Sequence, residues 1–276
     1  MLTLPKIPLI KSLGETPALK TVAQTGDCFE VLYQKAVKHY GITSLKILDT
    51  FSKYWIKRNP TPYLSEIAEL ADSHSKPGIW FLNVSFEWGC TCQVAQNLET
   101  GNMQISRVLD WPLGGLGTGL VAVLQNGPAG TYLSLTWPGF VGVVTGLAKG
   151  RFAAAINQAP MPSFGLGFYG DWLAGRIRVG QSRAMPGMHL LRYVFENAKN
   201  YTSAKKQLTS NPITVPCIIT LAGTEPNQGC VIEHTGEKAK IHPAPQTVAN
   251  HWLTDGLKGH ERDTKSRERA ELMRKS

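Results

Sequence analysis

Residues 89–111 read GCTCQVAQNLETGNMQISRVLDW, and this stretch contains two of the five cysteines of the chain. Two short segments rich in β-forming residues flank ETGN at positions 99–102, and Gly, Asn and Thr favour turns. We therefore predict a β-hairpin whose turn is centred in the middle of ETGN. Counting back from that turn places Cys90 opposite Trp111.

The predicted hairpin brings a sulfur, a guanidinium and a carboxylate toward one of its ends. Directly opposed residues have Cβ atoms about 4.5–5.5 Å apart, so Cys90, Arg107 and Asp110 can converge. Because Arg107 and Asp110 are an odd number of positions apart, a regular strand points them to opposite faces. A bulge or a strand end near Val108 and Leu109 is needed if both are to reach the sulfur.

This trio can support thiol chemistry. A nearby arginine favours the thiolate form of a cysteine. If the backbone were cut before Cys90, the new α-amine, with an ordinary pKa near about 8, could act as a base on its own thiol. Asp110 could then orient that amine.

The remaining motifs exclude several other chemistries. The five cysteines are too sparse for a disulfide framework, and their spacing does not fit a zinc site. The GLGFYG string at 165–170 follows a loop-like segment rather than a strand, which favours a glycine-rich turn over a dinucleotide site. We expect neither a cofactor nor a metal.

The pattern of apolar residues predicts an α+β protein. Residues 27–75 repeat apolar positions at helical spacing, and helices return at 188–208. Between them, from Gly78, short β-rich segments are separated by Gly, Asn and Pro. Helices that flank a run of antiparallel strands favour a layered α+β fold over a parallel one.

A longer stretch resembles a known family. Residues 63–96, YLSEIAELADSHSKPGIWFLNVSFEWGCTCQVAQ, resemble the processing-site segment of the N-terminal-nucleophile cysteine amidohydrolases, which include acid ceramidase and bile-salt hydrolases. RVLDW resembles the returning strand of their hairpin. The resemblance implies a four-layer αββα sandwich of antiparallel sheets flanked by helices. It further implies a helical prosegment at 1–89, released as a small chain, and a catalytic domain at 90–276.

The resemblance also implies roles for individual residues. Cys90 matches the nucleophile, released by autocatalytic cleavage after Gly89, and neutral amides match the donors to a developing oxyanion. The residues that the resemblance places in the site are Cys90, Arg107, Asp110, Asn157, Asn250 and Arg267.

Several alternatives stay open at these positions. Cys92 is a rival nucleophile, and Arg262 or Arg269 could take the place of Arg267.

The separation of Cys90 and Arg107 is one residue longer than is usual in the family. Gln158 stands where the ceramidase-like enzymes have a glutamate, which leaves the acyl-amide specificity open.

We therefore expect an amidohydrolase that cleaves the linear amide bond of an N-acyl substrate, fatty-acyl or ceramide-like, through a thioester. An acyltransferase of the same fold and a non-catalytic protein that binds an acyl ligand are the alternatives. The expected partners are the small-molecule substrate, the docked 1–89 segment and a lipid surface.

Charge and hydropathy indicate the compartment of the protein and the kinds of partner it can have. The net charge is +9, from 29 Lys and Arg against 20 Asp and Glu. Because these charges are scattered, they predict a basic surface rather than a nucleic-acid site. Apolar runs are too short for a membrane span, and Pro5, Lys6, Pro8 and Lys11 interrupt the N-terminal one. The sequence thus favours a cytoplasmic protein.

Overall fold

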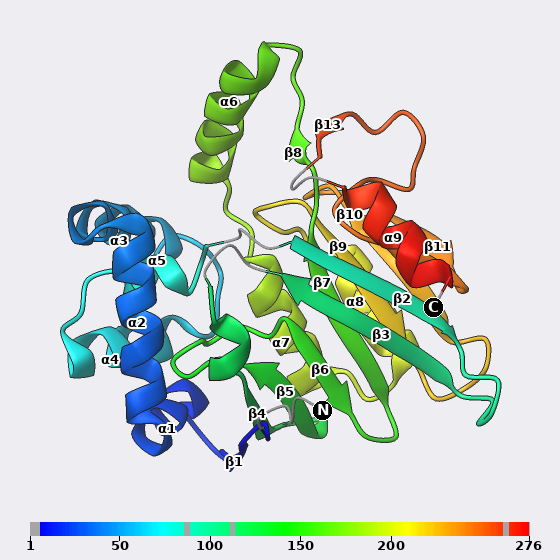
Figure 1. The fold of residues 1–276 in the computed structure, drawn as a ribbon, viewed down its shortest axis with the longest axis horizontal. Coiled ribbons are helices and arrows are strands. Elements are labelled where there is room, and N and C mark those ends of the chain that lie inside the picture. Colours follow the sequence, from blue (N-terminus) through cyan, green and yellow to red (C-terminus); the bar gives the residue numbers. More distant parts are fainter. Residues whose placement is uncertain (1–5, 86–88, 111–113, 262–264, 276) are drawn as a thin grey trace.

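An eight-stranded sheet lies at the centre of the structure, a computed structural model that describes residues 6–85, 89–110, 114–261 and 265–275 (Figure 1). Its strand order is β1-β4-β5-β6-β7-β9-β10-β11. All neighbouring pairs are antiparallel except β1 and β4, which are parallel. The strands are β1 (Leu9–Lys11), β4 (Val121–Gly127), β5 (Gly130–Thr136), β6 (Thr145–Ala148), β7 (Phe152–Gln158), β9 (Cys217–Ala222), β10 (Gly229–His234) and β11 (Ala239–Pro243).

Strand β9 is buried on both faces, which explains its continuous apolar sequence. Ile219 and Leu221 point to one side, into a cluster that includes Phe195 of a covering helix. Ile218 and Ala222 point to the other side, toward a second sheet. The strand period of two therefore divides β9 between two apolar cores.

The second sheet has three strands in the order β12-β2-β3 and lies on the large sheet, with β2 and β3 packed against β7 and β9 (Figure 1). Its strands are β2 (Gly89–Gln96), β3 (Met103–Asp110) and β12 (Gln246–Val248). Helices α7 (Gly187–Asn197) and α8 (Tyr201–Ser210) cover the far face of the large sheet, and α9 (Ser266–Lys275) covers β2 and β12. The layers are thus helix, sheet, sheet, helix, which confirms the predicted α+β class and its four-layer arrangement.

The N-terminal part of the chain is helical, as the apolar spacing predicts. Its helices are α1 (Pro17–Gln24), α2 (Gly26–Tyr40), α3 (Ile42–Ile56), α4 (Leu64–His74) and α5 (Ile79–Leu82). It begins, however, with β1, which extends the large sheet, and Ile10 packs there against Val121 and Val123. The described residues 6–85 therefore share a core with the strands that follow, and the division of residues 1–89 into a prosegment stays a prediction.

A buried ionic cluster also joins the two parts. The Arg192 guanidinium on α7 donates from Nη1 to Glu66 Oε2 on α4 at 2.6 Å and from Nε to Glu196 Oε1 at 2.8 Å. The hydroxyl of Tyr63 donates to Glu196 Oε2 at 2.7 Å, and its ring lies under the guanidinium. Both long side chains of the Arg192–Glu66 pair are more than nine-tenths buried. This cluster, called the Arg192 cluster below, fastens α4 to α7.

Helix α6 (Gly167–Gln181) projects from the layers and is held at its base (Figure 1). Gly165 and Gly167 both have positive φ values, 82° and 74°, so GLGFYG forms the predicted turn and then enters α6. Buried Asp171 accepts hydrogen bonds from the Phe164 and Leu166 main-chain N–H groups. These bonds hold the turn against the start of α6. The short strands β8 (Met161–Pro162) and β13 (Gly259–His260) pair beside it.

Candidate active site

Cys90 is the second residue of β2, the central strand of the small sheet, and its side chain is completely buried. Arg107 on the adjacent strand β3 donates from Nη2 to the Cys90 sulfur at 3.3 Å. The hairpin therefore does bring this thiol and this guanidinium together. The sulfur lies between the two sheets, within the apolar cluster that also contains Val144 and Ile156.

The predicted register of the hairpin is wrong by two positions, because Cys90 pairs with Leu109 and not with Trp111. The cause lies in Asn97, whose side-chain oxygen accepts from the main-chain N–H groups of Glu99 and Thr100 at 2.9 and 3.0 Å. This Asx-type turn starts the loop earlier than the ETGN motif indicates. Trp111 itself lies outside the described residues.

Arg107 is held by the large sheet, with its guanidinium directed at the sulfur. Its Nη2 also donates to the Ile156 carbonyl at 2.7 Å, and Nη1 donates to Val144 O and Thr145 Oγ1. These partners are neutral oxygens, so they orient the guanidinium without neutralising its charge. Arg107 is opposite Cys92 in the ladder, so its side chain reaches along the strand to Cys90.

The environment of Cys90 has opposing effects on its thiol. Burial raises the pKa of Cys90, while the Arg107 charge and hydrogen bond lower it, as do the Gln158 main-chain N–H and the Arg269 charge. Burial is the largest effect, so the thiol stays protonated near neutral pH. Burial similarly raises the pKa of Cys92 to about 11. Activation of either thiol thus needs a base or an opening of the site.

Asp110 is the last residue of β3 and pairs with Gly89 in the ladder. The ladder runs without interruption from Met103 to Asp110, so the bulge that the trio required near Val108 is not present. The side chain of Asp110 lies outside the described part of the structure. Its role in orienting an amine therefore stays a prediction.

Asn250 is the group that binds the Cys90 nitrogen. Its Oδ1 accepts from the Cys90 main-chain N–H at 2.8 Å, and its Nδ2 donates to the Gln158 carbonyl at 2.7 Å. Asn250 is fully buried between the end of β12 and the start of β2. The sequence prediction that Asn250 belongs to the site agrees with this position.

Asn157 lies on β7, and its side chain contacts Cys92 rather than Cys90. Its Oδ1 accepts from the Cys92 thiol at 3.1 Å, and its Nδ2 donates to the carbonyls of Val248 and Ala249 at 3.4 and 3.1 Å. Asn157 therefore joins the large sheet to the segment that carries Asn250. The structure brings it to Cys92, and its amide donors are directed at main-chain oxygens.

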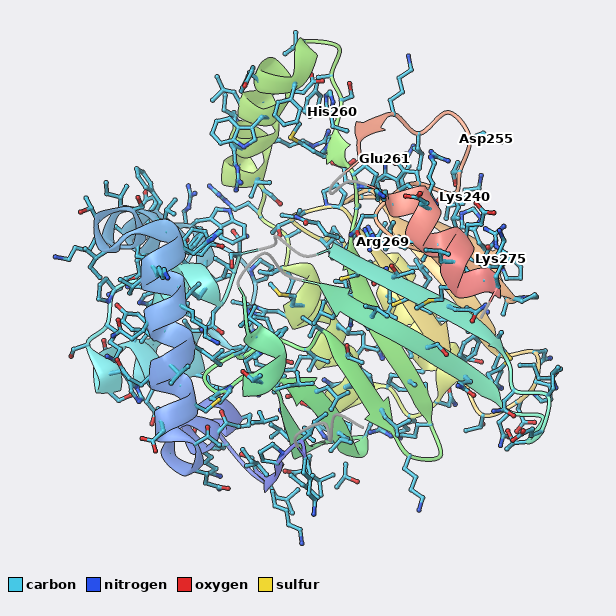
Figure 2. The ribbon with its side chains drawn as sticks, viewed as in Figure 1. Lys240, Asp255, His260, Glu261, Arg269 and Lys275 are labelled. Carbon is cyan, nitrogen blue, oxygen red and sulfur yellow. The ribbon has the colours of Figure 1, made fainter. Side chains whose placement is uncertain are left out.

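The arginine that reaches Cys90 from α9 is Arg269, and this corrects the placement of Arg267. Arg269 donates from Nη1 to the Cys90 carbonyl at 3.0 Å and from Nη2 to Asn250 Oδ1 at 3.0 Å. Arg267 lies on the exposed side of the helix and pairs with Glu261 at 2.8 Å. The phase of α9 decides this, because residues two apart on a helix point in different directions. Arg262 lies outside the described residues. Figure 2 shows Arg269 on the side of α9 that faces β2.

The two arginines can be compared directly by substitution. We expect Arg269→Met to slow any reaction at Cys90 by on the order of tenfold or more, since charge-assisted hydrogen bonds to the Cys90 carbonyl and to Asn250 are lost. Arg267→Met removes only an exposed ion pair and should change the rate less than about twofold. The measurement is the rate of backbone cleavage before Cys90, followed by intact mass. Equal effects of the two substitutions would contradict this placement.

Sequence reasoning missed the contribution of Gln158 to the site and two further groups beside Asn250. Gln158 supplies a main-chain N–H to the Cys90 sulfur and a main-chain carbonyl to Asn250. Such main-chain contacts leave no signal in residue identity. Ser266 and His251 surround the Asn250 main chain, and only their proximity to Asn250 and to the α9 arginines could have indicated them.

The described residues give two further observations on ligands and membranes. Within 6–85, 89–110, 114–261 and 265–275, no three His, Cys, Asp or Glu side chains are placed to bind one metal ion. Among the helices of those segments, none combines the length and the apolar character that crossing a bilayer requires.

Comparison with known proteins supports the family resemblance. No family model matches the chain. Over 207 residues, 72% of this chain, it is 26% identical to N-acylethanolamine-hydrolyzing acid amidase from Oryctolagus cuniculus, and over 99 residues it is 33% identical to acid ceramidase from Pan troglodytes. These matches confirm the resemblance to the N-terminal-nucleophile cysteine amidohydrolases. The chain spans 52% of the first relative and 23% of the second.

Two solved structures were also found to be similar. The Caenorhabditis elegans N-acylethanolamine-hydrolyzing acid amidase ortholog is 22% identical, with a TM-score of 0.48, and the match covers 66% of this chain and 85% of that one. A variant of the conjugated bile acid hydrolase from Clostridium perfringens is 12% identical, with a TM-score of 0.30, over 62% of this chain and 47% of that one.

Proposed function

We propose that the chain is an N-acyl amidohydrolase whose nucleophile is Cys90, exposed as a new N-terminus when the chain cuts itself after Gly89. The observation that carries this proposal is the set of contacts around one residue. Arg107 binds the Cys90 sulfur, Asn250 binds its nitrogen and Arg269 binds its carbonyl oxygen. The contact to the sulfur is the distinctive one, because a cysteine buried only for packing needs no guanidinium on its thiol, whereas its main-chain groups need partners in any case.

Self-cleavage follows from this arrangement. The Cys90 sulfur attacks the Gly89 carbonyl carbon, and the thiol proton passes to the Cys90 nitrogen as the Gly89–Cys90 bond breaks. Water then hydrolyses the resulting thioester, which restores the thiol and leaves a carboxylate on Gly89. Because Asn250 already accepts a hydrogen bond from the Cys90 nitrogen, it holds the leaving nitrogen during this step.

Turnover uses the amine that the cut produces. The Cys90 α-amine takes the thiol proton, the sulfur attacks the amide carbonyl of the substrate, and the proton passes to the departing amine. Water hydrolyses the acyl thioester and releases the acid. Arg107 favours the attacking thiolate, and Asn250 Nδ2, which here donates to Gln158 O, is the donor that we propose for the oxyanion.

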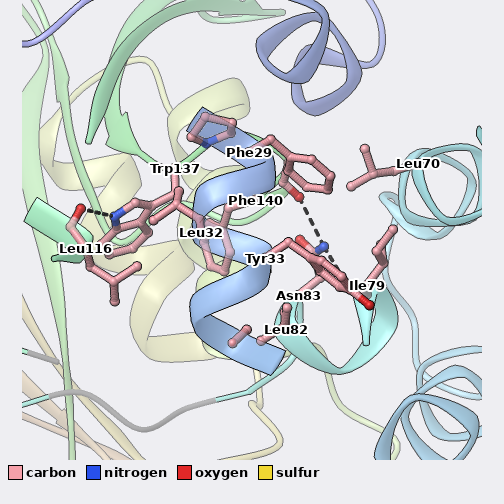
Figure 3. Close-up of a pocket in the computed structure, with 13 residues that line it drawn as sticks. Phe29, Leu32, Tyr33, Leu70, Ile79, Leu82, Asn83, Leu116, Trp137 and Phe140 are labelled. Carbon is pink, nitrogen blue, oxygen red and sulfur yellow. Dashed lines mark hydrogen bonds between the residues drawn. The ribbon is translucent and has the colours of Figure 1, made fainter. Parts of the chain in front are cut away.

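An apolar cavity of about 90 Å³ supports an acyl substrate (Figure 3). It lies between α2, α5 and the segment 137–140, so both parts of the chain line it. Leu32 and Trp137 line the cavity and also pack in the apolar cluster that contains Cys90. We propose that the acyl chain of the substrate extends from Cys90 toward this apolar cavity, which would have to widen to hold a fatty-acyl or ceramide-like chain.

Exposed apolar side chains support contact with a lipid surface, from which such a substrate would come. Phe51 and Tyr54 are exposed on α3, and Tyr169 and Leu173 are exposed on α6. The two helices meet near their C-terminal ends, where Trp55 Nε1 donates to the Val179 carbonyl at 2.8 Å. We propose that these exposed side chains, on either helix, are the points of contact with a membrane.

A non-catalytic protein that binds an acyl ligand is the second candidate, and one observation favours it. Cys90 is completely buried, and that burial raises the pKa of its thiol. Without a cut before Cys90, none of the side chains that the structure describes is placed as a base for the thiol, and its burial keeps a substrate away. The apolar cavity would then serve as a binding site alone.

The deciding experiment is intact mass of the purified chain during incubation at about pH 5 and about pH 8, on either side of the ordinary histidine pKa. We expect two fragments, residues 1–89 and 90–276, and hydrolysis of a fatty-acyl p-nitroanilide that increases as they accumulate. A sample denatured at the start of the incubation is the control. A chain that stays whole at both pH values, yet binds fatty acid, would contradict the hydrolase and support the binding protein.

A further inference from the structure

Ser266, the first residue of α9, is buried against the main chain of Asn250. Its Oγ accepts a hydrogen bond from the Asn250 main-chain N–H at 2.8 Å and lies 2.9 Å from His251 Nδ1. Ser266 is 1% exposed and His251 is 6% exposed, so water does not readily replace either contact. This hydroxyl joins α9, Asn250 and the imidazole at one point.

Side chains of α9 consequently form hydrogen bonds with both the main chain and the side chain of Asn250. Ser266 and Arg269 are three residues apart, which places them on the same face of the helix. Ser266 binds the Asn250 main-chain nitrogen, and Arg269 binds its Oδ1. The main chain of Asn250 decides where its carboxamide points, and that carboxamide binds the Cys90 nitrogen.

We propose that Ser266 and His251 are a positioning pair, which fixes the Asn250 main chain and thereby aims its carboxamide at the Cys90 nitrogen. This inference rests on the proposed function of Cys90. Both residues act through Asn250, so they are positioning residues rather than catalytic ones.

The Ser266 hydroxyl can form its hydrogen bond with the His251 imidazole in two directions. A serine hydroxyl has one hydrogen to donate, and its oxygen already accepts from Asn250 N–H. Its oxygen has a second lone pair, so the hydroxyl either donates to His251 Nδ1 or accepts from it, and the state of the imidazole decides which. We propose that the hydroxyl donates, which needs a neutral imidazole with its hydrogen on Nε2. Protonation of His251 puts a hydrogen on Nδ1, which reverses this hydrogen bond and leaves the hydroxyl hydrogen to find another acceptor.

The surroundings of His251 favour the neutral imidazole. Burial is the largest cause that lowers the pKa of His251, and positive charges on α9 lower it further, while two carboxylates oppose them. The charged groups that face it are Arg267, Arg269, Glu261 and Glu233. The proposed direction of the hydrogen bond is therefore present near neutral pH and is reversed as the pH falls through the lowered His251 pKa.

The first test compares Ser266→Ala with Ser266→Thr. We expect Ser266→Ala to slow self-cleavage, and to lower kcat for a fatty-acyl p-nitroanilide, by about five- to tenfold, the effect of one lost hydrogen bond. KM should change less than about twofold, because the substrate does not contact Ser266. Ser266→Thr keeps the hydroxyl and should restore most of the rate. Glu268→Ala, on the exposed side of the same helix, is the matched control.

A second pair of variants tests the imidazole. Asparagine can place its oxygen where Nδ1 lies, so His251→Asn should keep the neutral-pH rate, whereas His251→Leu should behave like Ser266→Ala. We expect the wild-type rate of self-cleavage, which precedes the formation of the Cys90 α-amine, to fall at acid pH as His251 is protonated. That fall should be absent in His251→Asn, which has nothing to titrate. If the rate falls equally at acid pH in His251→Asn, another group causes the fall, and the proposed role of His251 is wrong.

Hydrogen exchange of the Asn250 amide separates this inference from the proposed function. If the wild-type chain is never cut, but Ser266→Ala speeds this exchange by tenfold or more, on the order of one lost hydrogen bond, the hydrolase proposal fails while the positioning pair stands. If the wild-type chain is cut, and Ser266→Ala changes neither the exchange nor the rates, the positioning pair is wrong.

Discussion

A Cys90→Ala chain is expected to remain whole under conditions in which the wild-type chain separates into residues 1–89 and 90–276. Removal of the nucleophile leaves Arg107 and Asn250 in place but provides no sulfur to attack the Gly89 carbonyl. The loss should therefore exceed about a thousandfold, the scale on which nucleophile deletions act. Intact mass over several hours, with both chains incubated side by side, measures the difference.

Cys92→Ala is the matched control for this experiment. The Cys92 thiol donates to Asn157 Oδ1 and is completely buried, so its loss is expected to affect packing rather than cleavage. A fragment that begins at Cys92, or cleavage that survives in Cys90→Ala, would transfer the nucleophile to the second cysteine. The contacts of Arg269 and Asn250 would then need another explanation.

The largest expected effect on stability comes from Arg192→Met in the Arg192 cluster. This substitution leaves the carboxylates of Glu66 and Glu196 buried without their cation. Removal of one partner from a buried ion pair typically lowers the free energy of unfolding by about 3–5 kcal/mol. Urea unfolding followed by far-UV circular dichroism gives that free energy. In cut protein, the same change should release the 1–89 fragment more readily, because Glu66 belongs to it.

Arg178→Met provides the comparison for Arg192→Met. Arg178 pairs with Glu237 at 3.9 Å, and both side chains are largely exposed, so the loss should stay below about 1 kcal/mol. Similar midpoints for the two variants would show that the Arg192 cluster does not fasten α4 to α7. The ion pairs between α4 and α7 would then contribute little to the free energy of unfolding.

Local sequence signals predicted the hairpin and the Cys90–Arg107 contact because both depend on residues close in sequence. The β-forming segments and the turn residues lie within one stretch, 89–111. Even there the register differed by two positions, since the side chain of Asn97 starts the turn early. The prediction of which residues share a strand face was unaffected, because a register shift of two positions leaves every side chain on the same face.

The residues from distant segments were harder to predict. The resemblance placed Arg267 in the site and left Arg269 as an alternative, because composition and spacing cannot fix the phase of a helix against a sheet. The packing of α9 on β2 directs Arg269 to Cys90. Asn157 could be placed on a strand, but not behind Cys92. Ser266 and His251 act through the Asn250 main chain, and such contacts depend on tertiary structure alone.

The separation along the chain of the groups around Cys90 has a consequence for biosynthesis. Asn250 and Arg269 follow Cys90 by 160 and 179 positions. While a ribosome is still translating the intervening segment, Cys90 has neither contact, and Ser266 is not yet present to position Asn250. Self-cleavage would therefore be postponed until the polypeptide had been synthesised at least as far as Arg269 and had folded. A nascent chain that stalls before that point would keep its peptide bond after Gly89.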